Sequence, residues 1–405
     1  MSAVPAPAVH PTLHPTLHPT IPLVRQPSSP DIFDPRHYEG VRKPLAEAST
    51  LPPWAYTSEE FYRREVETIW MKAWNFFGRA DRVPNPGDYF AVDFVGVPII
   101  VIRGKDNQVR AFSNSCRHRG AAMLRGDGNC NAIRCPYHSW AYDFEGKLIV
   151  APEMEESTGF RVEDFPLIPL KLEVWAGFIF ISLDDQSGPL GDYLVDLPHV
   201  LSSYRFDNMK CVRLKEYTLE SNWKIYVENA MEAYHVSTVH RSTLSRQKGV
   251  FPTVVPAKGQ WMALHKEHEG TRALLTGDAG FPRIPTLAGK ASIGSYYPLI
   301  FPSTMFGATT DCMWWLELRP LSASKTKLIV GSCFPEEVTR RPDFEEVVQR
   351  YYKRWDLSIP EDNEISALQQ IGLASPFSKP GRLSHAEPLV HVFNNWVLDR
   401  VLGAH

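Results

Sequence analysis

The sequence predicts an α+β protein, in which a small all-β domain is followed by a larger domain with an antiparallel sheet and a long C-terminal helix. Three observations predict this class. Short alternating or continuously apolar runs separated by turn residues fill about 80–185. Strand-like runs bounded by Gly and Pro recur between 253 and 334, and a long helical pattern extends from about 342 to 370. At roughly 150 residues per domain, the 405 residues allow two or three domains.

Composition divides the chain into three regions. Residues 1–53 begin with Ala-Pro pairs and a His-Pro-Thr-Leu repeat, and these frequent prolines predict a disordered Pro-rich tail and lead-in. Residues 54–190 contain the β-rich domain with a preceding helix. Residues 191–405 contain the α+β domain.

The β-rich domain is expected to begin with a helix over about 57–75. Thr57-Ser58-Glu59-Glu60 has the form of a capping box, and apolar residues then recur at helical spacing. The turn residues 104–107 separate strands further along. We expect strands over 89–95, 97–102, 141–144, 147–150 and 174–183.

The α+β domain is expected to contain a helical stretch from Trp223 to about His240 and the long helix near its end. The Gly and Pro residues that bound the runs between them favour strands over helices. We expect these strands over 253–264, 295–306, 311–318 and 327–334.

Charge and cysteine content exclude several classes of protein. The 43 Lys and Arg nearly balance the 46 Asp and Glu, so the net charge of −3 does not favour nucleic acid or an anionic membrane as a partner. No apolar run approaches the roughly 18 residues of a membrane span, and the N-terminus has no secretory pattern, so we expect a cytoplasmic protein. Six cysteines are too few for a disulfide scaffold and are expected to be thiols or metal ligands.

Two loops in the β-rich domain combine cysteine with histidine. Cys116-Arg117-His118 and Cys135-Pro136-Tyr137-His138 are separated by sixteen residues. Zinc fingers space their paired ligands differently, whereas a Rieske [2Fe–2S] cluster takes two Cys on one iron and two His on the other. The loops, with Ser139-Trp140 after the second, closely resemble those of a Rieske domain in the form found in Rieske oxygenases. We therefore expect Cys116, His118, Cys135 and His138 to bind the cluster.

A second group of metal-binding residue types follows Asn222-Trp223-Lys224. Glu232 and His235 share a helix face, but His235 and His240 are five residues apart, about 140° around a helix. Both histidines can bind one ion only if the helix breaks or bulges between them. Two histidines and one carboxylate form the facial triad of non-haem Fe(II) oxygenases. On local geometry the carboxylate is either Glu232 or a member of the cluster Glu361, Asp362 and Glu364.

This second segment resembles the mononuclear-iron motif of the Rieske non-haem iron oxygenases, and the resemblance covers about 54–400. It implies a helix-grip type catalytic domain in which His235, His240 and Asp362 bind Fe(II). By the same resemblance Glu232 links this iron to a Rieske histidine of a neighbouring subunit, and Asn229 and Tyr234 lie near the iron. Most ring-hydroxylating members have Asp where this chain has Glu232, and carnitine-type members are known with Glu.

The resemblance implies a terminal oxygenase large (alpha) subunit that uses O2 and electrons passed from the cluster to the mononuclear iron. The chain contains no Gly-x-Gly-x-x-Gly fingerprint, so a separate NAD(P)H-dependent reductase, with or without a ferredoxin, is expected to supply the electrons. Family members are trimers or α3β3 hexamers, and we expect a homotrimer or an α3β3 assembly. Glu232 favours monooxygenation or demethylation, although the rest of the motif is equally similar to aromatic ring-hydroxylating subunits.

The expected substrate is a small organic molecule, either an aromatic compound or a methylated or quaternary amine. Aromatic residues on expected strands could stack an arene or hold a quaternary ammonium by cation–π attraction. A Rieske electron carrier or a zinc-stabilised binding module is the alternative, and it would not need the second metal site. The aromatic candidates are Trp261, Tyr296, Tyr297, Phe306, Trp314 and Trp315.

Overall fold

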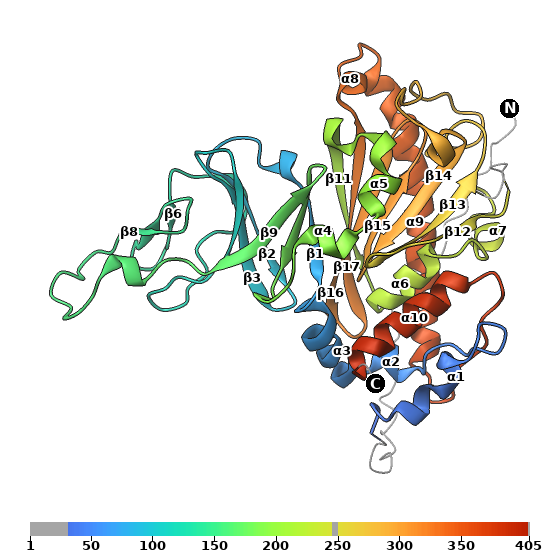
Figure 1. Ribbon diagram of the computed structural model, residues 1–405, viewed down its shortest axis with the longest axis horizontal. Coiled ribbons are helices and arrows are strands. Elements are labelled where there is room, and N and C mark those ends of the chain that lie inside the picture. The colour runs from blue at the N-terminus through green and yellow to red at the C-terminus, as the bar shows by residue number, and fades with distance from the viewer. Residues whose placement is uncertain (1–30, 245–249, 404–405) are drawn as a thin grey trace, which may run out of the picture. The chain divides into compact units, whose positions relative to one another are not determined.

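A computed structural model describes residues 31–244 and 250–403 (Figure 1). The His-Pro-Thr-Leu repeat lies outside the described residues. The chain divides into two units, Met1–Ile32 and Phe33–His405, and all elements below belong to the second. Antiparallel sheets and helices make up this unit, so the predicted α+β class is confirmed.

Ten α-helices and seven short helical turns of other types occur in the described part of the chain. No helix among these described residues is long and apolar enough to cross a membrane. The α-helices are α1 (Glu39–Arg42), α2 (Trp54–Thr57), α3 (Glu59–Glu65), α4 (Leu190–Leu194), α5 (Leu197–Val200), α6 (Trp223–Ala230), α7 (Val236–Val239), α8 (Glu336–Thr339), α9 (Phe344–Leu373) and α10 (Pro388–Val401). The turns are η1 (Pro35–Tyr38), η2 (Val66–Trp70), η3 (Ala80–Arg82), η4 (Val162–Asp164), η5 (Ser202–Tyr204), η6 (Phe206–Asn208) and η7 (Gly289–Ser292).

The first ten strands form a seven-stranded antiparallel sheet in the order β1-β10-β9-β4-β3-β2-β5 and a three-stranded sheet β6-β7-β8. The run 174–183, expected as one strand, contains a hairpin turn. Ala176 and Gly177 both have positive φ, and Trp175 pairs with Phe178 across this turn. These strands are β1 (Trp74–Arg79), β2 (Asp88–Phe94), β3 (Val97–Arg103), β4 (Val109–Ser113), β5 (Gly126–Asn129), β6 (Ile133–Arg134), β7 (Ala141–Tyr142), β8 (Leu148–Val150), β9 (Pro169–Trp175) and β10 (Phe178–Ser182).

The remaining strands form a second antiparallel sheet in the order β11-β17-β16-β15-β14-β13-β12. The expected strands 253–264 and 295–306 are each two strands, and Pro302, which lacks an N–H to donate, lies between the second pair. The edge strand β11 was not predicted, because its several charged residues leave no clear alternation of apolar and polar side chains. These strands are β11 (Met209–Leu219), β12 (Thr253–Val255), β13 (Trp261–Glu267), β14 (Gly294–Ile300), β15 (Thr304–Ala308), β16 (Met313–Ser322) and β17 (Lys325–Pro335).

The long helix α9 packs on this second sheet and matches the helix predicted over 342–370. Trp355 of α9 lies against Trp314 of β16, with ring centroids 5.7 Å apart, and Tyr351 lies against Phe334 of β17 at 5.1 Å. The helix continues through Pro360, which has no N–H to donate to the preceding turn. A sheet covered by a long helix is the arrangement expected of the helix-grip type.

The helix predicted over 57–75 is divided into α2, α3 and η2. Ser58 is the N-cap of α3, since its backbone is extended and its hydroxyl accepts a 3.3 Å hydrogen bond from Phe61 N. The expected capping box beginning at Thr57 is therefore displaced by one residue, because Thr57 ends α2 and its hydroxyl donates back to Pro53 O at 3.1 Å.

Part of the lead-in that was expected to lack structure is ordered. Tyr38, Val41, Ala48 and Leu51 are buried. The Nε2 atom of His391 on α10 lies 3.1 Å from Val41 O. This is one of several contacts between the lead-in and the C-terminal helix. Because these contacts join the two ends of the unit, local sequence pattern does not predict them.

A buried ion pair joins the N-terminal helices to α6. Lys224 Nζ lies 2.5 Å from Glu65 Oε1, and both side chains are completely buried. Trp223 Nε1 also donates to Glu65 Oε2 at 3.1 Å. Burial raises the pKa of Glu65 and lowers the pKa of Lys224, and each charge opposes the shift of the other. The start of α6, which precedes the histidine segment, therefore depends on a residue of α3.

Candidate active site

Two tight turns in the β-rich domain hold Cys116 and Cys135. Gly120 N donates to Cys116 O at 2.8 Å, and Ser139 N donates to Cys135 O at 3.1 Å. Gly120 and Ser139 close these turns in the left-handed region, with φ of +75° and +61°. Both cysteines are buried, and burial, assisted by the adjacent Cys116 thiol, raises the pKa of Cys135. The Tyr142 hydroxyl lies 3.5 Å from Cys116 Sγ.

The same two turns bring the histidines together. The rings of His118 and His138 have centroids 4.7 Å apart, and His118 stacks on Trp140 at 5.0 Å. His138 Nδ1 is buried and has no hydrogen-bond partner among the described residues. A buried nitrogen of this kind fits a metal ligand. A thiol pair and an imidazole pair on two loops are the donors that a Rieske [2Fe–2S] cluster requires.

The break in the predicted helix 223–240 covers 231–235 and ends with His235, and α7 occupies the interval between the two histidines. The carboxylate of Glu232 accepts hydrogen bonds from Tyr234 N and from His235 N, the latter at 3.2 Å. These bonds replace the helical ones and end α6. The break was therefore expected at the wrong position, because the sequence does not show this side-chain hydrogen bonding.

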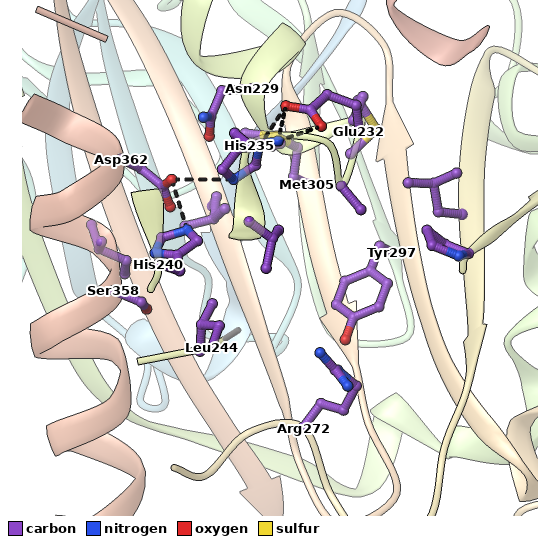
Figure 2. Close-up of a pocket in the computed structure, with 18 of the residues that line it drawn as sticks. Asn229, Glu232, His235, His240, Leu244, Arg272, Tyr297, Met305, Ser358 and Asp362 are labelled. Atoms are coloured by element: carbon purple, nitrogen blue, oxygen red, sulfur yellow. Dashed lines mark hydrogen bonds and ion pairs between the residues drawn. The ribbon is translucent and has the colours of Figure 1, made fainter. Parts of the chain in front are cut away.

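His235, His240 and Asp362 converge, as Figure 2 shows. One ligand atom from each lies within 4.8 Å of the others. Asp362 Oδ1 is 3.0 Å from His240 Nε2 and 3.6 Å from His235 Nε2. Two imidazoles and one carboxylate at such distances fit an Fe(II) facial triad. Glu361, another candidate for the third ligand, instead contacts Nδ1 of His240, the ring nitrogen on the side away from Asp362.

Each histidine of the triad has a carboxylate on its other ring nitrogen. Glu232 Oε1 lies 2.5 Å from His235 Nδ1, and Glu361 Oε2 lies 2.6 Å from His240 Nδ1. Thr243 donates its hydroxyl to Glu361 Oε2 at 2.7 Å. An Nδ1–H held by a carboxylate leaves Nε2 unprotonated and directed at the shared point, as metal ligation requires.

Glu361→Gln is expected to weaken metal binding at the triad by about 10- to 100-fold, because the amide does not replace the charged hydrogen bond to His240 Nδ1. Iron content after titration with a chelator measures the effect. Glu364→Gln is the matched control, since Glu364 is exposed on the same helix. Equal iron retention by the two variants would contradict this role of Glu361.

A cavity of about 160 Å³ adjoins the triad. This volume is below the roughly 300–1,000 Å³ of typical ligand pockets, so it suits a small molecule. Asn229 and Glu232 line it near the triad, as predicted for Asn229. Tyr234 is 63% exposed and is absent from the cavity lining, so the structure does not bring it to the site. Its backbone N–H, rather than its ring, contacts Glu232.

Three of the six aromatic candidates, Tyr297, Phe306 and Trp314, line the cavity. Trp261, Tyr296 and Trp315 lie in the hydrophobic core of the second sheet. Tyr226 and three cationic residues of the lining were not predicted from the sequence. The cations are Lys266, Arg272 and Arg354.

A further residue that the sequence analysis missed is Glu228, buried on α6. Tyr56 donates its hydroxyl to Glu228 Oε1 at 2.7 Å. Burial, with a smaller contribution from Glu387, raises the pKa of Glu228 from 4.5 to about 7, although Tyr56 and Lys224 oppose the shift. Between these values the folded protein keeps a proton that the unfolded chain releases, so the contribution of Glu228 to stability falls as pH rises from about 4.5 to about 7.

Glu228→Gln is therefore expected to become more stable relative to the original protein as pH rises. The gain between pH 5 and pH 8 is on the order of 1–3 kcal/mol in the free energy of unfolding. Denaturant unfolding at the two pH values measures it, with Glu220→Gln, an exposed position before α6, as control. A stability difference from the original protein that is the same at both pH values would show that Glu228 does not titrate in this range.

Comparison with known families identifies both domains. Residues 73–167 match the Rieske [2Fe-2S] domain, and residues 206–403 match the ring hydroxylating alpha subunit (catalytic domain). The chain therefore belongs to the Rieske non-haem iron oxygenases, as a terminal oxygenase alpha subunit. It carries a Rieske cluster and a mononuclear iron, takes electrons from a reductase and acts on a small substrate. The alternative of an electron carrier or zinc module has no support.

Its relatives include oxygenases of quaternary amines. The chain is 28% identical to the chloroplastic choline monooxygenase of Atriplex hortensis, over 87% of this chain and 78% of the relative. It is 26% identical to the glycine betaine monooxygenase oxygenase subunit of Pseudomonas aeruginosa, over 87% and 89%. A solved quaternary ammonium Rieske monooxygenase, described for carnitine oxidation and inter-subunit electron transfer, matches with a TM-score of 0.74 and 26% identity over 87% and 95%.

Proposed function

We propose that this oxygenase oxidises a small methylated or quaternary amine at a carbon bonded to the nitrogen. The observation that carries the proposal is a His-His-Asp triad opening into a small cavity with aromatic walls. Aromatic faces attract a quaternary ammonium that has no N–H to donate. The substrates named for the relatives, choline, glycine betaine and carnitine, belong to this class.

In this proposal His235, His240 and Asp362 hold the mononuclear iron, and the cluster is held by Cys116, His118, Cys135 and His138. The bound cluster supplies electrons singly and the bound iron activates O2. Hydroxylation of an N-methyl C–H bond consumes one O2, two electrons and two protons and yields one water. The resulting carbinol loses formaldehyde and leaves the demethylated amine.

The chain's own residues hold this site in a reactive geometry. The carboxylates of Glu232 and Glu361 fix the ring orientation and tautomer of the two histidines. The rings of Tyr297 and Trp314 line the cavity and give it apolar walls. Asn229, which lies beside the triad in Figure 2, positions substrate or O2 through its amide.

We further propose a cyclic homotrimer in which Glu232 connects the iron site with the Rieske domain of the next subunit. Its contact with an iron ligand supports this role, because Glu232 Oε1 lies 2.5 Å from His235 Nδ1 and the Glu232 side chain keeps 9% of its surface exposed. A heterologous interface repeated around a threefold axis would close such a ring.

The test is electron paramagnetic resonance of the dithionite-reduced holoenzyme with an iron count, followed by turnover with a reductase. A Rieske-type signal, about three irons per chain and formaldehyde from a methylated amine are expected. Choline, glycine betaine and L-carnitine are the amine probes, with naphthalene as the arene. Oxidation of naphthalene without any amine oxidation would overturn the proposed substrate class.

A further inference from the structure

One wall of the cavity is a single face of α9. Arg354, Ser358 and Asp362 are four residues apart in turn, share that face and all line the cavity. At 1.5 Å per residue, Arg354 and Asp362 are about 12 Å apart along the helix axis. The helix therefore presents a carboxylate at the metal end of the cavity and a guanidinium two turns away.

Arg354 is a buried cation with few partners. It is 8% exposed, its Nη1 atom donates to Ser358 Oγ at 3.3 Å, and its Nε atom is buried without a hydrogen-bond partner. The guanidinium carbon lies 4.8 Å from the centroid of the Trp314 ring. No carboxylate of the described residues forms an ion pair with Arg354. Burying such a charge is costly unless an anion compensates it, and a guanidinium stays charged.

Two more cations surround this end of the cavity. Lys266 of β13 and Arg272 line it, and Figure 2 shows Arg272 directed toward the Tyr297 hydroxyl and away from the triad. Arg272 lies close enough to both Arg354 and Lys266 to lower the pKa of each, after the larger effect of burial. The pKa of Lys266 falls to about 8, so it remains mostly protonated at neutral pH.

The acidic residues of the cavity are at the opposite end. Asp362 faces the two histidines and Glu232 holds His235, so neither forms an ion pair with Arg354, although Tyr297 and Asp362 oppose part of the lowering of the Arg354 pKa. A cavity that only had to hold a cationic amine would not place the buried Arg354 guanidinium in its wall without a carboxylate partner, because like charges repel the ligand.

We propose that Arg354, with Lys266 and Arg272 beside it, binds a carboxylate of the substrate while the carbon to be oxidised lies at the His235, His240 and Asp362 end. A planar guanidinium matches a carboxylate through two parallel hydrogen bonds. The inference rests on the proposed function and narrows it: the preferred substrates are zwitterions with an ammonium group and a carboxylate, rather than amines with positive charge alone.

The test compares matched ligands that differ in the anionic group, bound to the holoenzyme in chloride-free buffer. The pairs are glycine betaine with choline, L-carnitine with its methyl ester, and benzoate with benzamide. Calorimetric titration is expected to show at least about 10-fold tighter binding of the carboxylate in one or more pairs, as a hydrogen-bonded charge provides. No carboxylate preference in any pair, including no binding by any carboxylate, would overturn the proposal.

Arg354→Gln is expected to reduce that preference by about 10- to 100-fold. Lys353→Gln, at the exposed neighbouring position on α9, is the control and is expected to keep it. Lys266→Gln provides a second, independent variant and is expected to reduce the preference as well. A preference unchanged in both Arg354→Gln and Lys266→Gln would also overturn the proposal.

The binding results separate this inference from the proposed function. Turnover of choline without any carboxylate preference would overturn the anion site and leave the amine oxygenase in place. Selective binding of benzoate without turnover of any amine would support the anion site and overturn the proposed substrate class.

Discussion

Asp362→Ala and His235→Ala are each expected to reduce turnover below detection while the Rieske cluster stays intact. Each variant removes one of three ligand atoms that lie within 4.8 Å of one another. The metal site then keeps two protein ligands, whereas the turns around Cys116 and Cys135 are unchanged. The iron count should fall from about three to about two per chain, with the Rieske-type electron paramagnetic resonance signal retained.

Glu364→Ala is the control for these variants, because Glu364 is exposed on the helix that carries Asp362. It should retain both the iron content and the turnover of the original protein. Turnover retained in both Asp362→Ala and His235→Ala would refute the assignment of the iron site.

Glu232→Gln, loaded with excess Fe(II), is expected to slow electron transfer between the cluster and the iron site by about 10- to 100-fold per iron-loaded site. The substitution keeps one oxygen acceptor for the backbone N–H groups of Tyr234 and His235. It removes the charged hydrogen bond to His235 Nδ1, on which we expect transfer to depend. The rate at which the reduced cluster is reoxidised by O2 and substrate in a single turnover measures the effect.

Two further measurements distinguish transfer from support of the metal site. If Glu232 only holds His235, the iron content should fall and the reoxidation rate per loaded site should be normal. If it carries transfer, the reoxidation rate per loaded site should fall and Glu232→Asp, which retains the charge, should restore much of that rate. Single-turnover kinetics unchanged by Glu232→Gln would remove the proposed bridge.

Residues whose function depends on local spacing could be predicted from the sequence. Cys116 and His118 lie in one turn and Cys135 and His138 in another, so their spacing directly reflects the geometry of the loops. The strands β2 and β3 could also be predicted from the sequence, because apolar residues that alternate or run together indicate a strand with a buried face.

Residues whose function depends on tertiary contact were harder to predict. Local geometry left Glu232, Glu361, Asp362 and Glu364 as candidates for the third ligand. Only packing of α9 against the histidine segment shows that Asp362 faces Nε2 of His240 while Glu361 faces Nδ1. Arg354 was missed, although its spacing from Asp362 is a visible helical repeat. Tyr234 was expected near the iron by resemblance alone, but a break in the helix turns its ring outward.

The Glu65–Lys224 pair has a consequence for how this enzyme can be divided. A fragment that starts at residue 206 contains the whole matched catalytic domain but lacks Glu65. The fragment would also lack Tyr56 and Phe61, whose rings lie over the Lys224 ammonium, so Lys224 and the start of α6 would become exposed. We therefore expect the C-terminal half to be less stable alone than in the whole chain, and an exchange of N-terminal segments between homologues that includes residue 65 should take Glu65 and Lys224 from the same parent.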